Sequence, residues 1–288
     1  MADRIRIVGI RGFAHHGVLD HERAIGQEFT VDVELDADFT AAATTDDLAL
    51  TVDYGQVAQI AHDRLLADPP FRLIESLADA IAADVVSLPG VQAVAVTVHK
   101  PHAPMPVGVA DVSVTRRRRA PARVVLGLGS NLGDRLAHLR RAVTALAADG
   151  VEILATSPVV RSDPAGGPAD QGEFLNAVVV GRTDLTPHEV LRRCRQIEDA
   201  AGRDRSVRWG PRPIDVDILD FAGQRLAEPD LLLPHPRLAS RVFVLQPWAA
   251  IAPEDRPGGT GPTVTELLAA LDTTGVAPVP GLSLMAGP

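Results

Sequence analysis

Two aspartates lie two residues apart in the segment RWGPRPIDVDILDF, residues 208–221. Asp215 and Asp217 belong to a run rich in β-branched residues, and the period of two along a strand puts both carboxylates on one face. Oxygen ligands this close suit Mg²⁺, which binds through a few carboxylates together with substrate phosphates. The segment therefore predicts a magnesium site that works on phosphates.

Four arginines precede this pair in a loop rich in Gly and Pro: Arg203, Arg205, Arg208 and Arg212. Guanidinium groups beside paired carboxylates fit polyphosphate transfer, because they neutralise charge that develops on the phosphates. The alternative is an edge strand with a salt-bridged loop, and the density of the cluster favours the phosphate site. The chain has no GxxxxGK[ST] motif, which excludes a P-loop kinase. The glycine-rich segment GLGSNLGD, residues 127–134, fits a tight strand–helix turn better than a phosphate loop.

The first half of the chain holds its single lysine, Lys100, and its single tyrosine, Tyr54. A lysine amine can release a proton where arginine cannot, and a phenol can relay one. Glu22 lies in the segment HGVLDHERAIGQ, and Glu75 opens a helical pattern, where free N–H groups favour an anion. We expect an acid–base site here. The alternatives are that Lys100 and Tyr54 survive by chance, that Glu22 is a solvated loop carboxylate, and that Glu75 is only a charge at the start of a helix.

The hydrophobic pattern of the first half predicts the elements that carry these residues. Alternation with period two indicates strands at 4–10, 28–37, 91–100 and 109–115, and helical spacing indicates helices at 55–67 and 75–88. An antiparallel sheet with two helices on one face follows. The run RRRRAPAR, residues 116–123, ends this half; a solvated strand end and linker is favoured over a nucleic-acid patch, because the rest of the chain is acidic.

The second half alternates strands and helices in another order. Strands are expected at 124–129, 152–160, 173–181 and 214–219, and helices at 135–148, 187–201 and 264–271. This is the βαββαβ order of a ferredoxin-like α/β sandwich, so the whole chain is predicted to be α+β. We expect domains at 1–118 and 124–275, a linker at 119–123 and a flexible tail at 276–288.

Composition narrows the class of protein. The net charge of −9 argues against nucleic acid or an anionic membrane as partner. Cys194 is the single cysteine, so no disulfide can form within the chain, and its helical setting predicts an inert core thiol. The N-terminal segment lacks the apolar region of a signal peptide, and no apolar run reaches the roughly 18 residues of a membrane span. We expect a cytoplasmic protein.

Four segments of the first half resemble dihydroneopterin aldolase of the folate pathway, over nearly all of residues 1–118. They are HGVLDHERAIGQ, TVDYG, RLIESLA and HKPHAP, which occur in the order and spacing of that family. The resemblance implies a tunnelling fold, in which protomers form rings that stack into an octamer with sites between neighbours. It implies no cofactor, metal or Schiff base, because the protonated pterin ring accepts the electrons.

The same resemblance assigns roles to residues of this chain. Pterin binding falls on Glu75, Leu73 and Ile74 and, from a neighbouring chain, on Val52 and Asp53. Proton transfer in the retro-aldol step falls on Lys100, Glu22 and the neighbour's Tyr54, which also stacks on the pterin. Which of these three moves which proton stays open.

Residues 123–272 resemble 6-hydroxymethyl-dihydropterin pyrophosphokinase, through GLGSNLGDR, FLNAVV, RWGPRPIDVDILDF and LPHPRLASRVFVLQP. The resemblance implies ATP as co-substrate and two Mg²⁺ ions held by Asp215 and Asp217. It assigns stabilisation of the transferred group to Arg203 and Arg212. It assigns pterin binding to Ser162, Pro164, Ala165, Phe174, Asn176, Trp209 and Phe243. It assigns contacts with nucleotide or phosphates to Glu198, His235 and Arg241.

The two resemblances fit together, since the aldolase product is the substrate of the kinase. We expect a bifunctional folate-pathway enzyme that cleaves dihydroneopterin to glycolaldehyde and 6-hydroxymethyl-dihydropterin, and then pyrophosphorylates the latter with release of AMP. The alternative is an active pyrophosphokinase whose N-terminal domain serves only as an oligomerisation scaffold. The presence of Glu22, Tyr54, Glu75 and Lys100 together speaks against that alternative.

Overall fold

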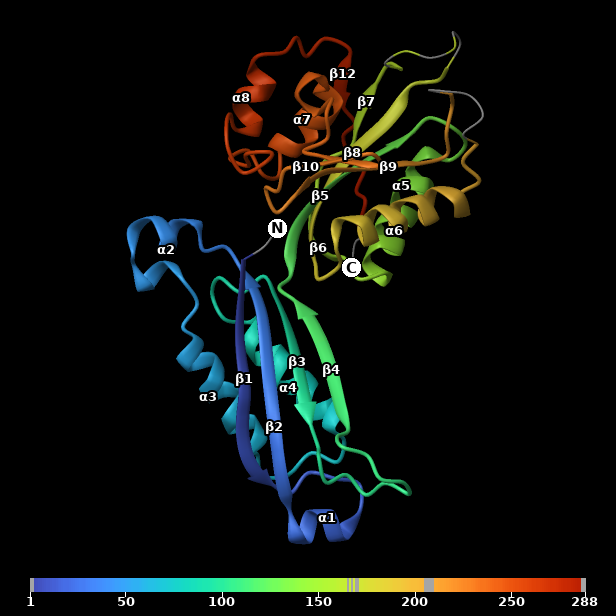
Figure 1. Cartoon of the computed structure of the whole chain (residues 1–288). Coiled ribbons are helices and arrows are strands. Elements are labelled where there is room, and N and C mark those ends of the chain that lie inside the picture. Colours follow the sequence, from blue (N-terminus) through green and yellow to red (C-terminus); the bar gives the residue numbers. More distant parts are fainter. Residues whose placement is uncertain (1–2, 165, 167, 169–170, 205–209, 286–288) are drawn as a thin grey trace. The chain divides into compact units, whose positions relative to one another are not determined.

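The chain divides into two compact units. The computed structural model describes residues 3–164, 166, 168, 171–204 and 210–285 (Figure 1). The units are Met1–Ala120 and Pro121–Pro288, and each has its own hydrophobic core. Within the described residues, no helix has the length and the apolar character that a membrane span requires.

The first unit is a four-stranded antiparallel sheet with two helices over one face (Figure 1). Its strands, in the order in which they pair, are β1 (Asp3–Ala14), β2 (Gln27–Ala37), β3 (Ala93–His99) and β4 (Ser113–Arg119). The covering helices are α3 (Tyr54–Leu65) and α4 (Ile74–Val86). Shorter helical segments are α1 (Asp20–Ile25), α2 (Thr40–Thr45) and the 3₁₀ turn η1 (Leu48–Leu50). The sheet with two helices agrees with the sequence prediction.

The core of the first unit follows from alternation along the strands. Val31 and Val33 of β2 face Val98 and Val96 of β3 in register, and all four are buried. Side chains between them on each strand are only partly buried, because they lie on the face that the helices leave uncovered. Helix α3 begins at its N-cap Asp53, whose carboxylate accepts hydrogen bonds from two backbone N–H groups.

The arginine run forms the end of β4, where the sequence predicted that the strand stops at 115. The register with β3 carries β4 on to Arg119. Arg116 Nε donates to Asp79 of α4 at 2.7 Å, and Arg118 binds the same carboxylate through two nitrogens at 3.0 and 2.7 Å. These bonds hold the pKa of Asp79 down to about 2. Two of the four arginines therefore fasten a helix to the sheet.

The second unit is built on an antiparallel sheet in the strand order β12-β7-β8-β5-β9, with β6 also paired to β8. Its strands are β5 (Ala122–Ser130), β6 (Glu152–Thr156), β7 (Val160–Ser162), β8 (Phe174–Thr183), β9 (Asp215–Phe221) and β12 (Val276–Pro278). A separate hairpin consists of β10 (Leu226–Glu228) and β11 (Leu231–Leu233). The helices are α5 (Arg135–Ala148), α6 (Pro187–Ala200), η2 (Leu238–Ser240), α7 (Val242–Ala249) and α8 (Val264–Ala269).

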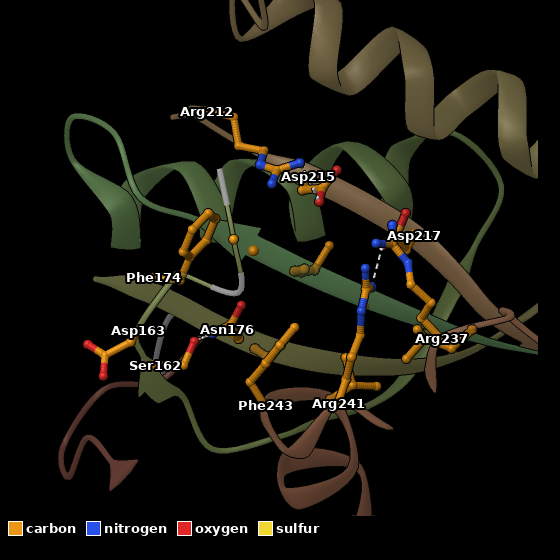
Figure 2. Close-up of a pocket in the computed structure, with 17 residues that line it drawn as sticks. Ser162, Asp163, Phe174, Asn176, Arg212, Asp215, Asp217, Arg237, Arg241 and Phe243 are labelled. Atoms are coloured by element: carbon orange, nitrogen blue, oxygen red, sulfur yellow. Dashed lines mark hydrogen bonds and ion pairs between the residues drawn. The ribbon is translucent and has the colours of Figure 1, made fainter. Parts of the chain in front are cut away.

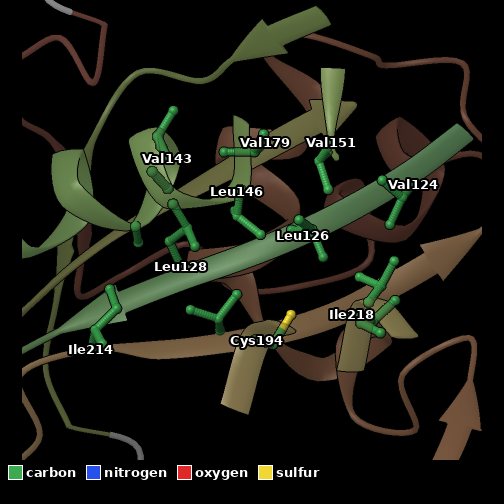
Figure 3. Close-up of a cluster of buried hydrophobic side chains, with 14 of the residues drawn as sticks. Val124, Leu126, Leu128, Val143, Leu146, Val151, Val179, Cys194, Ile214 and Ile218 are labelled. Carbon is green, nitrogen blue, oxygen red and sulfur yellow. The ribbon is translucent and has the colours of Figure 1, made fainter. Parts of the chain in front are cut away.

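Helices cover both faces of this second sheet (Figure 1). Leu126 of β5 and Val179 of β8 pack toward α5 and α6, in the cluster that Figure 3 shows, with Cys194 on α6 among them. The next residues along the same strands, Val125 and Val178, pack toward α7 and α8. The strands therefore read as nearly continuous apolar runs, as expected when both faces are buried.

The second unit contains one helix that the sequence analysis did not predict, and it differs from the prediction in its tail and its linker. The region around 242–249, read only as a motif, is the helix α7, which includes Pro247. The tail from 276 begins with β12, which pairs with β7, and Leu284 is buried, so this part is not a loose tail. The expected linker 119–123 is short, because β4 ends at Arg119 and β5 begins at Ala122.

Candidate functional sites

A pocket lies in the second unit at one end of β5, β8 and β9 (Figure 2). Its charged lining includes Asp215 and Asp217 from β9, with Arg212, Arg237 and Arg241 from the segments around them. On the other side, Phe174 and Asn176 from β8 and Phe243 from α7 line it. The pocket thus has an ionic end lined by charged side chains and an aromatic end lined by two phenylalanine rings and the Asn176 amide.

Asp215 and Asp217 lie on one face of β9, as the period of two predicts. Asp215 forms ion pairs with Arg203 and with Arg212, the latter at 3.1 Å. Asp217 Oδ2 lies 3.3 Å from Arg241 Nη1 and 3.7 Å from His235 Nε2. Burial and the neighbouring carboxylate of Asp215 raise the pKa of Asp217 above its ordinary value. The site therefore combines two carboxylates with at least three arginine side chains.

The arginines leave hydrogen-bonding capacity directed at an anion. Arg212 Nε is buried and has no hydrogen-bond partner among the described residues. The guanidinium of Arg212 lies 5.5 Å from the ring centroid of Phe174, and that of Arg241 lies 5.6 Å from Phe243. Each cation therefore stands between the acidic pair and an aromatic ring, so the arginines link the ionic and aromatic ends of the pocket.

The aromatic end presents a buried amide. Asn176 is 5% exposed, and its Nδ2 donates to Ser162 Oγ at 2.9 Å. That bond uses the amide nitrogen, so the carbonyl oxygen can accept from a ligand N–H group. Phe174 and Phe243 both line this end and are partly buried. A flat, nitrogen-rich ring would match this combination of aromatic faces and a buried amide.

Glycines form the floor of the pocket, a feature that the sequence analysis did not assign. Gly127 and Gly129 of β5 pair with Asp217 and Asp215, respectively, in the ladder with β9. A Cβ at position 129 would lie 3.1 Å from Asn176 Oδ1, a tight contact that would push on the amide. Side chains at these positions would fill the space beside the acidic pair, so the GLG segment keeps the floor open.

Asn131 is a second residue that the sequence analysis did not assign. Its Oδ1 accepts from the Arg212 backbone N–H at 2.8 Å, and its own N–H donates to the Arg212 carbonyl at 3.2 Å. Its Nδ2 donates to Gln171 Oε1 at 3.2 Å. Asn131 therefore fixes the segment that carries Arg212. The quoted GLGSN motif contained this residue, but no local pattern indicates a partner 81 positions away.

The structure places several predicted residues elsewhere or leaves them undescribed. Glu198 is buried on α6, where its Oε1 accepts from the Val216 N–H at 2.9 Å and pairs with Arg203. Glu198, Arg203 and His235 are outside the described pocket lining, and Arg203 links the Glu198 carboxylate to Asp215. Ala165 and Trp209 lie outside the described residues, and Pro164 is partly buried beside the lining residue Asp163.

The first unit brings together two residues that are 78 positions apart. Lys100 Nζ donates to Glu22 Oε1 at 2.5 Å, and their side chains are only 10% and 5% exposed. Glu22 Oε2 also accepts from the Leu19 N–H at 3.0 Å. Burial disfavours the Glu22 carboxylate, but the hydrogen bonds from Lys100 and Leu19 outweigh burial, and the pKa of Glu22 lies below its ordinary value. This is a buried, charged proton donor–acceptor pair.

Glu75 lies in the first turn of α4, one residue after the start of the helix at Ile74. Its side chain is exposed, and Leu73 is the N-cap residue. Backbone N–H groups at this end are free of helical partners, so Leu73, Ile74 and Glu75 present both donors and a carboxylate. A ring that carries donors and acceptors on one edge would match such a group.

The other three predicted residues of the first site lie at the opposite end of α3. Tyr54 is the first residue of that helix and is 64% exposed. Asp53 is the N-cap, and Val52 is buried. Helix α3 has 12 residues, so Tyr54 lies about 16 Å along the axis from Leu65 at the other end. Leu65 accepts from His16, whose ring packs on Phe29, and Lys100 lies over the same Phe29 ring. The described chain does not unite Tyr54 with the Glu22–Lys100 pair.

Two family models match the chain. Residues 125–253 match the model described as 7,8-dihydro-6-hydroxymethylpterin-pyrophosphokinase, and residues 5–117 match the model described as dihydroneopterin aldolase.

Named relatives agree with the pyrophosphokinase match. The 2-amino-4-hydroxy-6-hydroxymethyldihydropteridine pyrophosphokinase of Methylorubrum extorquens is 48% identical over 155 residues, which are 54% of this chain and 96% of that protein. The enzyme of the same name from Mycobacterium tuberculosis is 45% identical over 162 residues, 52% of this chain and 84% of that protein. A solved structure of E. coli dihydroneopterin aldolase in complex with neopterin is 27% identical and covers 40% of this chain and 98% of that one, with a TM-score of 0.38.

Proposed function

We propose how the residues of both sites act, from the premise that this chain belongs to the 7,8-dihydro-6-hydroxymethylpterin-pyrophosphokinase family and also carries a dihydroneopterin aldolase domain. It is a bifunctional enzyme of folate synthesis. The first domain cleaves dihydroneopterin to 6-hydroxymethyl-dihydropterin and glycolaldehyde. The second transfers pyrophosphate from ATP to that hydroxymethyl group and releases AMP. We assign these activities to a tunnelling-fold domain and a ferredoxin-like domain, with their boundary near residues 119–123.

In the kinase site, the pterin would lie at the aromatic end of the pocket. Phe174 and Phe243 would enclose the ring, and the free carbonyl oxygen of Asn176 would accept from a pterin N–H group. The bond from Asn176 to Ser162 supports this role, because it fixes which side of the amide faces the pocket. Ser162, Pro164, Ala165 and Trp209 would complete the enclosure. The hydroxymethyl oxygen would then point toward the ionic end.

The acidic pair fits Mg²⁺. Both carboxylates line the pocket from one face of β9, so their oxygens can serve the same ion or adjacent ions. Asp215 and Asp217 would hold two ions, which, when bound, neutralise phosphate charge and orient the β-phosphorus. Arg212 would turn its unpartnered Nε toward a phosphate oxygen. Arg203 and Arg212 would stabilise the transferred group, while Arg241 and His235 would contact the nucleotide phosphates.

In the aldolase site, the Glu22–Lys100 pair would move protons during the retro-aldol step. Lys100 Nζ donates to Glu22 Oε1, so a proton can pass directly between these two groups, and either group could exchange it with a substrate hydroxyl. Glu75 would anchor the pterin through its carboxylate, with backbone donors and acceptors of Leu73 and Ile74 beside it. The substrate ring itself would accept the electrons, so the step uses no Schiff base.

A complete aldolase site would require a neighbouring chain. The length of α3 keeps Tyr54 about 16 Å from the cluster at its other end, so a copy of this chain would supply Tyr54, Asp53 and Val52. The edge strands β1 and β4 have unpaired edges within the described chain, and Val8, Leu48 and Leu50 are exposed apolar side chains. Such features favour association. We propose that protomers form a ring and that two such rings stack into an octamer.

One assay separates the proposed functions from the scaffold alternative. Glycolaldehyde and AMP are measured from one sample supplied with dihydroneopterin, ATP and Mg²⁺. We expect EDTA, or the variant Asp217→Ala, to abolish AMP formation and to leave glycolaldehyde formation nearly unchanged. Glycolaldehyde production by the untreated protein would rule out a mere scaffold. Loss of both products on chelation would contradict the metal-free aldolase, and loss of neither would contradict the Asp215–Asp217 metal site.

A further inference from the structure

His16 is a buried histidine of the first unit that none of the roles above uses. It lies in the segment between β1 and α1 and is 1% exposed. Its ring packs edge-on against Phe29, with centroids 5.4 Å apart, and lies 5.7 Å from the ring of Phe71. Lys100 Nζ lies 5.8 Å from the centroid of the same Phe29 ring. His16 is therefore one aromatic ring away from the proposed proton-transfer pair.

Both nitrogens of the His16 ring have backbone partners. The Phe71 N–H donates to Nδ1 at 2.9 Å, and Nε2 lies 2.8 Å from the Leu65 carbonyl oxygen. A backbone N–H can only donate, so Nδ1 must be the acceptor and Nε2 must carry the proton that it donates to Leu65. The ring is neutral and fully engaged, which excludes it as a group that exchanges protons with substrate.

These bonds join three segments that are distant in the sequence: the loop that carries His16, the end of α3 and the segment before α4. Leu65 is the last residue of α3, and Phe71 precedes the start of α4 by three residues. The Gly17 N–H donates to the Phe71 carbonyl at 3.1 Å, so His16 and Gly17 together hold both polar groups of the Phe71 backbone. A Cβ on Gly17 would lie 2.6 Å from Glu22 Oε2, which shows how closely this segment approaches the Glu22 carboxylate.

We propose that His16 is a positioning residue for the aldolase reaction. It holds the segment from Phe71 to Glu75, which supplies the pterin anchor, at a fixed place relative to Glu22 and Lys100. Phe71 is two residues from Leu73 and four from Glu75, so a shift of its backbone moves the anchor. The inference rests on the proposed role of Glu75 in pterin binding.

Two matched variants separate the bond to Phe71 from the rest of the ring. In His16→Asn, the short side chain reaches as far as Nδ1, and its amide oxygen can still accept from the Phe71 N–H. In His16→Gln, the longer side chain reaches the position of Nε2 and can still donate to Leu65, but it leaves the Phe71 N–H without its acceptor. Each variant loses one hydrogen bond of a buried residue. The midpoint temperature of thermal unfolding of the first unit should therefore fall by similar amounts in both variants.

The test is the KM for dihydroneopterin in glycolaldehyde release, measured on the full-length protein without ATP. We expect His16→Gln to raise the KM about tenfold, because a lost buried hydrogen bond misplaces the anchor, with a smaller change in kcat. His16→Asn should stay within about threefold of the unchanged protein. AMP formation from 6-hydroxymethyl-dihydropterin and ATP should be normal in both variants, which controls for the concentration of the protein and the integrity of its second unit, while circular dichroism at the assay temperature checks that the first unit is folded.

Two outcomes would overturn the inference. Equal KM values for His16→Asn and His16→Gln would mean that His16 acts only through general packing. A loss confined to kcat would mean that the pterin anchor does not depend on it. Glu75→Gln is measured in parallel as the check on the premise: if its KM is unchanged, the anchor role of Glu75 fails, and the inference fails with it. A raised KM for Glu75→Gln combined with equal His16 variants would reject the inference alone.

Discussion

Replacing Lys100 by methionine should destabilise the first unit strongly at neutral pH. The Lys100–Glu22 pair is 2.5 Å long, with side chains 10% and 5% exposed. Methionine therefore leaves the Glu22 carboxylate buried, with the Leu19 N–H as its one remaining hydrogen-bond donor among the residues that the structure describes. Removal of one member of a buried pair costs about 3–5 kcal/mol of unfolding free energy. That is roughly a hundredfold to several-thousandfold change in the unfolding equilibrium constant.

The loss of unfolding free energy in Lys100→Met should grow as the pH rises. In the unchanged protein the pKa of Glu22 is lowered, so its stabilising contribution is present above the ordinary carboxyl range and is lost as the pH falls through the lowered pKa. In Lys100→Met, burial acts almost unopposed and raises the pKa of Glu22. The variant therefore loses stability as the pH rises above about 4.3. Below that pH, the difference in unfolding free energy between the variant and the unchanged protein shrinks.

Lys100→Arg is the matched control for charge. It keeps a cation beside Glu22, so the first unit should retain most of its stability, but arginine does not release its proton at working pH. We expect glycolaldehyde release to fall by about 10²–10⁴-fold, the usual contribution of general acid–base catalysis. Pterin binding should change little, because Glu75 is the proposed anchor.

Urea unfolding followed by two probes measures the stability effect. Both tryptophans, Trp209 and Trp248, belong to the second unit, so tryptophan fluorescence reports on that unit while far-ultraviolet circular dichroism reports on both. The circular dichroism transition that has no fluorescence counterpart belongs to the first unit. If Lys100→Met is as stable as the unchanged protein at pH 7, the buried pair is not energetically coupled. If Lys100→Arg cleaves dihydroneopterin at the normal rate, Lys100 is not the proton-transfer group.

Three further results are expected. Chains with Tyr54→Phe and chains with Glu75→Ala should each be poor aldolases, but mixing them should restore part of the activity, because some sites then take an intact half from each chain; an active monomer in light scattering would contradict this. Asp79→Asn should lower the unfolding free energy of the first unit by about 1 kcal/mol or less, since its two arginine partners are partly exposed. As the pKa of Asp79 is about 2, its contribution is present above the ordinary carboxyl range and is lost as the pH falls toward 2, so the Asn variant and the unchanged protein should converge in acid denaturation. Cys194, whose pKa burial raises to about 12, should react with a thiol reagent only after the second unit unfolds, and rapid labelling of the native protein would show that the α6 face opens.

The elements that sequence periodicity predicted well are those with one clear face. Helix α5 (Arg135–Ala148) has the predicted bounds, because its apolar residues recur at helical spacing and Asp134 caps it. The segment 242–249 has no such face: VFVLQPWA is apolar nearly all round and contains a proline, so no period identified α7. Its helical state depends on packing against the sheet, which places Val244, Leu245 and Trp248 in a buried cluster.

The end of β4 shows the same limit for strands. The alternation in VADVSVT predicted a strand that stops before the arginines, since four charges in a row indicate a solvated segment. The register with β3 continued the strand, and Asp79 on α4 supplied the partner for two of those charges. The run of arginines is visible in the sequence, but the sequence does not indicate that Asp79 is their partner.

The sequence by itself indicated the chemical groups of both candidate sites and, for the aspartate pair, their local geometry. It placed Asp215 and Asp217 on one face of a strand, because the two-residue period is a property of the extended backbone alone. Only the tertiary structure decided which groups meet. Glu22 and Lys100 are 78 residues apart and share a buried ion pair, while Tyr54 begins helix α3 and is exposed. Local periods repeat every 2 or 3.6 residues and carry no record of which strands pair. Contacts across such distances depend instead on strand register and on the packing of helices against the sheet.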